Sequence, residues 1–195
     1  MTSGPRAPAL REAARLALTV DGSRWGELGA LLQRGVGVPV REGATVQAFL
    51  TEQLGVDPDY VRERVSTVFL DGWVVDSLER AVLHHGSSLA LSAAMPGLVG
   101  ATFRKGGFYS ALRAGISLQD GGDGRGAGAG EEGIVRVKLF NLLIRELGPA
   151  LLRHGVLLER AEAAALLGEL APGKPGPPGC GPVLLQLDLS PSEGR

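Results

Sequence analysis

The stretch from Thr45 to Val75, TVQAFLTEQLGVDPDYVRERVSTVFLDGWVV, places a helix pattern directly before a hairpin pattern. Thr45 is a residue type that caps helices. The apolar residues that follow it recur with helical spacing on one face, at Val46, Phe49, Leu50 and Leu54. Two apolar runs between Val65 and Val75 are joined by Asp71-Gly72, a dipeptide typical of type I′ turns. The stretch therefore predicts one amphipathic helix followed by a two-stranded hairpin.

Three further apolar runs flank this centre and predict strands, at Leu16 to Val20, Val36 to Val40 and Leu89 to Leu91. The predicted order is strand, strand, helix, strand, strand, strand. One helix packed across a mixed sheet of four or five strands is the β-grasp plan, so the fold class expected is α+β. Trp25, Phe49 and Trp73 are expected to pack in the core or on the hairpin.

The end of this block, Gly86 to Ala101 (GSSLALSAAMPGLVGA), resembles the tail of ubiquitin-like sulfur carriers of the molybdopterin-synthase small-subunit and thiamine-biosynthesis type. The resemblance covers Leu16 to Ala101. Carriers of that family act through a free terminal Gly-Gly, whereas here Gly100-Ala101 stands at the matching position and the chain continues to Arg195. The resemblance implies, as an alternative function, a carrier precursor that needs cleavage after Gly107 to expose Gly106-Gly107.

Glycine and proline divide the chain. A glycine-rich stretch at 119–133 predicts a flexible linker, and the proline- and glycine-rich stretch 171–182 predicts a stiffer loop. The domains expected are 14–118, a β-grasp-like (ubiquitin-like) unit, and 134–195, which holds the 171–182 loop.

The second unit contains a sequence that is similar to part of the first. Glu27 to Val36 (ELGALLQRGV) is matched by Glu146 to Val156 (ELGPALLRHGV). Strand patterns at Val135 to Phe140 and Val183 to Leu189, with a helical face from Ala163 to Leu170, complete the comparison. We interpret 134–195 as a shortened β-grasp-like repeat, the alternative being chance similarity in a chain rich in leucine, alanine and glycine.

Composition excludes several classes of function. With 20 basic and 21 acidic residues the net charge is −1, which argues against a polybasic nucleic-acid binder. One cysteine forms no internal disulfide and, with three histidines, no zinc cluster, so no metal or cofactor is expected. The longest uncharged run, 86–103, contains glycine, serine and Pro96, which argues against a membrane span. We expect no secretory signal and a cytoplasmic location.

Catalytic motifs are incomplete. Gly168 to Lys174 has the spacing of a phosphate-binding loop, but Pro175 replaces the hydroxyl residue that should hold magnesium. His84 and His85 are expected to be solvated, His154 to contact carbonyl groups at a helix end, and Cys180 to be exposed. No catalytic residue is predicted, and an enzyme acting in a cleft between the two units stays an alternative without a named base.

The segment from Met95 to Tyr109 (MPGLVGATFRKGGFY) is the predicted partner-binding surface. It combines apolar, cationic and aromatic side chains, a composition suited to docking another protein. The predicted binding residues are Met95, Pro96, Gly97, Arg104, Lys105, Gly106, Gly107, Phe108 and Tyr109. The function expected is a non-catalytic, cytoplasmic protein-binding module of ubiquitin-like type; the alternative for this segment is a crossover packed on the sheet.

Overall fold

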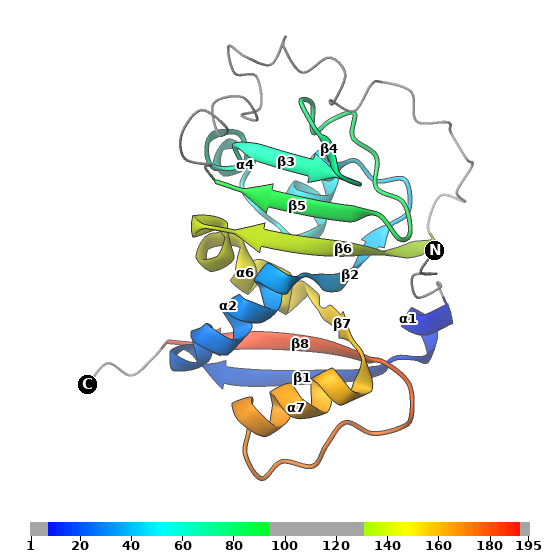
Figure 1. The fold of residues 1–195 in the computed structure, drawn as a ribbon, viewed down its shortest axis with the longest axis vertical. Helices are drawn as coiled ribbons and strands as arrows, with labels where there is room; N and C mark the ends of the chain where they lie inside the picture. The colour runs from blue at the N-terminus through cyan, green and yellow to red at the C-terminus, as the bar shows by residue number, and fades with distance from the viewer. Residues whose placement is uncertain (1–7, 94–130, 192–195) are drawn as a thin grey trace.

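The computed structural model describes residues 8–93 and 131–191, which form a mixed α+β fold around one eight-stranded sheet (Figure 1). The sheet order is β1-β8-β7-β2-β6-β5-β3-β4. Its strands are β1 (Ala14–Asp21), β2 (Val36–Arg41), β3 (Thr67–Leu70), β4 (Trp73–Val74), β5 (Ser88–Ser92), β6 (Glu132–Phe140), β7 (Val156–Leu158) and β8 (Val183–Ser190). β1 pairs with β8, and β5 with β6, in parallel, and the other neighbours are antiparallel.

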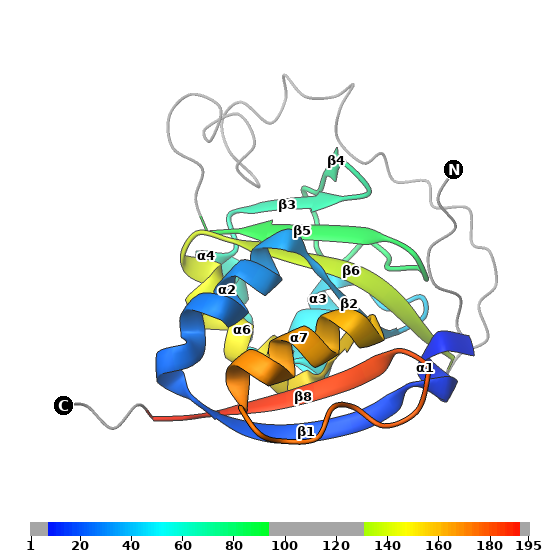
Figure 2. The ribbon, with the colours of Figure 1, turned by 60° about the horizontal axis from the view of Figure 1, so that its bottom comes forward.

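Helices connect most of these strands. They are α1 (Pro8–Glu12), α2 (Trp25–Arg34), α3 (Val46–Ala48), α4 (Pro58–Arg64), α6 (Leu142–His154) and α7 (Arg160–Leu170). A short 3-10 helix, η1 (Gly22–Arg24), precedes α2, and a π-helical turn, η2 (Phe49–Gln53), continues α3. In the view of Figure 2, α2, α6 and α7 lie between the β3–β5–β6 side of the sheet and the β8–β1 end.

One main core joins the helices to the sheet. Its fully buried large side chains come from both sequence segments and include Leu28 and Leu32 of α2, Phe49 of η2, and Leu143 and Leu147 of α6. A small second cluster holds Leu10, Ile134, Leu157 and Leu184. Because apolar side chains from both segments share the main core, the two segments stabilise each other.

The strand predictions for β1, β2, β5, β6 and β8, the hairpin β3–β4 and helix α7 are confirmed. The hairpin turn has positive φ at both Asp71 (53°) and Gly72 (85°), as a type I′ turn requires. Thr45 caps α3, its Oγ accepting from the Ala48 N–H at 3.1 Å. The helix differs from the regular amphipathic helix expected over Val46 to Leu54, because its second half is a π turn.

Strands from the N-terminal and C-terminal segments are intermixed in the sheet, since β8 and β7 lie between β1 and β2, and β6 lies between β2 and β5. β2 pairs with β6 along Val36 to Arg41 and touches β7 at Gly37 and Leu157. The expected linker lies outside the described residues through residue 130, whereas Glu132 and Gly133 already belong to β6. The structure therefore shows a mixed α+β sheet shared by both segments.

The aromatic side chains have different environments. Phe49 is fully buried, and Trp25 is partly buried against the core, so both pack as predicted. Trp73 lies on the hairpin strand β4 but is 48% exposed. Trp73 therefore lies on the hairpin, one of the two places predicted, and it stays outside the core because β4 is the edge strand of the sheet.

Candidate functional site

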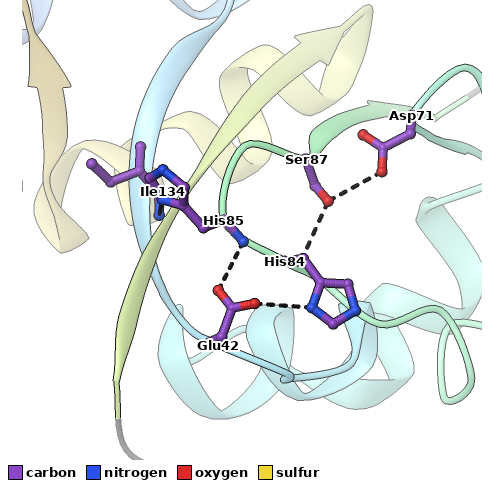
Figure 3. Close-up of polar contacts among 6 residues, drawn as sticks. All are labelled: Glu42, Asp71, His84, His85, Ser87 and Ile134. Atoms are coloured by element: carbon purple, nitrogen blue, oxygen red, sulfur yellow. Dashed lines mark hydrogen bonds and ion pairs between the residues drawn. The ribbon is translucent and has the colours of Figure 1, made fainter. Parts of the chain in front are cut away.

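The polar cluster around Glu42 is a candidate site that the sequence does not predict (Figure 3). Glu42 directly follows β2, and its backbone N–H donates to the Glu131 carbonyl at 2.9 Å. One carboxylate oxygen, Oε1, lies 2.9 Å from His84 Nδ1, and the other, Oε2, accepts from the His85 N–H at 2.8 Å. A single carboxylate thus joins the end of β2 to the 84–85 loop.

A second carboxylate supports the same loop from the hairpin turn. Asp71 accepts from Ser87 Oγ at 3.1 Å and from the Ser88 N–H at 2.6 Å. Ser87 Oγ in turn accepts from the His84 backbone N–H at 3.3 Å. Asp71 has a positive φ, a conformation that aspartate tolerates better than most residues. In this turn its carboxylate lies against Ser88, the first residue of β5.

The hydrogen bonds fix different tautomers for the two histidines in their neutral forms. His85 Nδ1 accepts from the Ile134 N–H at 3.2 Å, so its proton lies on Nε2. His84 Nδ1 faces the Glu42 carboxylate, which only accepts, so its proton lies on Nδ1. His84 Nε2 therefore carries the lone pair, and it points away from Glu42 (Figure 3).

Gly133 of β6 leaves the room that Glu42 occupies. A Cβ at this position would come within 2.5 Å of Glu42 Oε2 and 3.3 Å of the His85 Cα. A side chain at residue 133 would therefore displace the Glu42 carboxylate from its position against the 84–85 loop.

The chemistry available here is proton transfer. Glu42 is 14% exposed and orients a His84 side chain that is 42% exposed, so the imidazole is held in place and is still partly accessible to solvent. A carboxylate that fixes the tautomer of a histidine is the arrangement used in acid–base catalysis. Ser87 cannot serve as the nucleophile of this pair, because its hydroxyl hydrogen bonds to Asp71 and to the His84 backbone.

A second polar cluster connects α4 to α6. Tyr60 Oη donates to Glu146 Oε2 at 2.6 Å, and the Arg64 guanidinium forms an ion pair with the same carboxylate. The hydrogen bonds from Arg64 and then Tyr60 hold the pKa of Glu146 below its ordinary value. Burial, followed by the bond to Glu146, raises the pKa of the Tyr60 hydroxyl well above its ordinary value. Tyr60 and Arg64 of α4 both bond to Glu146 of α6, so we assign this cluster to helix docking.

The nine residues predicted to bind a partner, from Met95 to Tyr109, all lie outside the described residues. Cys180 is exposed, as predicted. His154 does not contact a carbonyl of its own helix; its Nε2 lies 2.8 Å from the Pro39 carbonyl of β2. Its ring also meets Phe49 edge to face, with centroids 6.3 Å apart.

His84 and His85 lie in a loop, as predicted, but both are partly buried and hydrogen-bonded. Their partners Glu42 and Ile134 lie 42 and 49 residues away along the chain. Because these partners are so far apart along the chain, the spacing of residues in the sequence does not predict this cluster.

Within 8–93 and 131–191, no group of three or more histidine, cysteine or acidic side chains is arranged to hold a metal ion. Among the same residues, none of the helices has the length and apolar character needed to cross a membrane. Comparison with protein-family models, with curated proteins and with solved structures gave no match to this chain.

Proposed function

We propose that this chain is a non-catalytic protein-binding module, with the segment from Met95 to Tyr109 as its main contact surface. The observation that supports the proposal is the exposure of Leu142, which is 56% accessible at the start of α6. Its neighbour Asn141 donates from Nδ2 to Ser92 Oγ at 3.0 Å. Leu142 therefore lies beside the end of β5, from which the chain leads within three residues to Met95.

Leu142 is thus an exposed apolar side chain close to the end of β5, and the sequence that follows β5 contains the apolar segment MPGLVGATF. Protein interfaces combine such apolar contacts with a few cationic and aromatic side chains, which Arg104, Lys105, Phe108 and Tyr109 supply. The partner is expected to be another protein with an apolar surface bordered by acidic groups.

Co-purification from the native cell with three full-length variants tests this proposal. Leu142→Asp, and separately the double change Arg104→Glu with Lys105→Glu, should each lose the same captured protein and keep the melting temperature of the parent chain. Trp73→Ser removes an exposed apolar side chain from β4 and is the matched control, which should keep that protein. Retention of every captured protein by both test variants would contradict the proposed surface.

A second candidate function rests on Glu42 and His84, whose geometry suits acid–base chemistry on a small molecule. Hydrolysis of a p-nitrophenyl ester by the full chain tests whether His84 takes part in acid–base or nucleophilic chemistry. His84→Asn should abolish the protein-dependent rate, Glu42→Gln should lower it about tenfold, and His154→Asn should leave it unchanged. A rate that His84→Asn does not change would contradict this function.

The internal repeat and the β-grasp kinship also remain proposals. In support of the repeat, α2 and α6 both end at a glycine with positive φ, Gly35 (96°) and Gly155 (123°). Each glycine N–H donates to a leucine carbonyl of its helix, Leu31 or Leu151, and a strand follows at once. The carrier alternative predicts a mature chain ending at Gly107, and the intact mass of the protein from its native cell tests that cleavage.

A further inference from the structure

β1 forms one edge of the sheet, and its outer side has the features of a strand that pairs with another chain (Figure 1). Natural edge strands are usually protected by proline, by charged side chains or by shortness. β1 contains eight residues, all of them in register with β8; it has no proline or lysine, and its two charged residues, Arg15 and Asp21, lie near its ends. The opposite edge strand, β4, has only two residues.

The hydrogen bonds of β1 show which of its backbone groups face outward. The Ala14 N–H donates to the Pro182 carbonyl at 3.0 Å, so Ala14 directs its backbone groups toward the β8 side. In a parallel ladder, alternate residues bond to the same neighbour. Leu16, Leu18 and Val20 therefore face β8, and the intervening residues, Arg15, Ala17, Thr19 and Asp21, direct their N–H and C=O groups outward.

These outward residues are accessible in the described structure. Arg15, Ala17, Thr19 and Asp21 are all exposed. Between β1 and the loop 171–182, the described residues share one backbone hydrogen bond, from Ala14 to Pro182. The loop therefore does not occupy the outward donors of the strand.

We propose that two copies of this chain associate through β1, as an antiparallel pair centred on Leu18. In this register Arg15 lies opposite Asp21 of the second copy, and Ala17 lies opposite Thr19. Every outward-facing residue then meets another outward-facing residue, as the ladder geometry requires. The two sheets join into one, and the Leu18 side chains, partly buried in each monomer, meet at the two-fold axis.

The charges select this register over its neighbours. A shift of two residues in one direction places Arg15 opposite Thr19, and a shift in the other direction places it opposite Ser23. Only the register centred on Leu18 brings opposite charges together, and it does so twice because of the two-fold symmetry. Asp21 Oδ1 already accepts from the Ser23 N–H at 2.8 Å, so this carboxylate is held at the end of the strand.

A charge swap in the full chain, followed by analytical ultracentrifugation, tests the proposal. The parent should dimerise, and Arg15→Asp or Asp21→Arg alone should weaken dimerisation about tenfold or more, because like charges then face each other twice. Mixing these two variants should give a heterodimer, since each pair again carries opposite charges. The double variant should dimerise like the parent, and Arg62→Asp on α4 is the control that should change nothing.

Proline substitution tests the backbone pairing independently of charge. Ala17→Pro removes an outward N–H, so it should leave the melting temperature of the monomer nearly unchanged and abolish dimerisation. Leu18→Pro removes an N–H that faces β8 and should lower the melting temperature much more.

Three results would overturn the proposal. They are a parent chain that stays monomeric at about 100 μM, a dimer that both single charge variants retain, and single variants that fail to associate when mixed. None of these results bears on the Met95–Tyr109 surface, because co-purification with Leu142→Asp measures that surface separately.

Discussion

Individual glycines in this protein have opposite roles, although Gly148 and Gly168 both lie inside helices. A Cβ at Gly148 would come within 2.7 Å of Trp25 Cη2 and 2.8 Å of Leu32 Cδ1. A Cβ at Gly168 would meet no atom within 4 Å. Gly148 is therefore required for the packing of α6 on α2, whereas Gly168 only lowers helix propensity.

These glycines make a paired prediction. Gly148→Ala should lower the free energy of unfolding by about 1–3 kcal/mol, because the indole and Leu32 must shift. Gly168→Ala should raise it by about 0.5–1 kcal/mol through helix propensity. Chemical denaturation of both variants measures the difference, and equal effects of the same sign would contradict the packing described around Trp25.

The same residues explain which helices could be predicted. The sequence does not predict a helix over 25–34, because Gly26 and Gly29 interrupt its apolar pattern. In α6, Gly148 and Pro149 interrupt the apolar pattern in the same way, so the sequence predicts only the end of this helix near His154. A Cβ added at Gly29 would lie 3.4 Å from Ile144 Cγ2 of α6. These small residues therefore lie where α2 and α6 pack together, a contact that local sequence does not reveal.

At the scale of elements, the attachment of α4 to α6 depends on the ionised form of Glu146. Its pKa is lowered in the folded protein, so its contribution to stability is present above the ordinary pKa of a glutamate and is lost as the pH falls through the lowered value. Glu146→Gln should therefore reduce stability at pH 7 by about 1 kcal/mol or less, since the ion pair is partly exposed.

Urea denaturation of the parent and Glu146→Gln across the acidic range measures this dependence. The difference between the two proteins should shrink as the pH falls below the ordinary glutamate value. Glu63→Gln, on the exposed side of α4, is the control and should show little difference at any pH. A Glu146→Gln effect that grows on acidification would have the wrong sign for this account.

For the whole molecule, the strands that alternate apolar and polar residues could be predicted from local sequence, but their neighbours could not. The spacing of Val36 to Val40 and of Val135 to Phe140 predicted both strands, whereas nothing in either segment showed that β2 and β6 pair. The Glu42 cluster depends on the same long-range pairing, because β6 brings Gly133 and Ile134 to His85.

A shared sheet predicts one cooperative unfolding transition for both sequence segments. Val137 of β6 is fully buried opposite Val36 of β2. Val137→Ala should lower the free energy of unfolding by about 1–3 kcal/mol. It should also shift the transition reported by the fluorescence of Trp25 and Trp73 and that reported by far-ultraviolet circular dichroism by the same amount. Two separate transitions would show that the segments unfold independently.

The pairing of β2 with β6 is tested most directly by backbone nuclear Overhauser effects in the full chain. The account predicts cross-strand contacts between Gly37 and Arg136 and between Val38 and Val135, together with the parallel pattern that places Leu89 beside Val137. If Val38 instead showed contacts only to strands of the N-terminal segment, the shared sheet would be wrong.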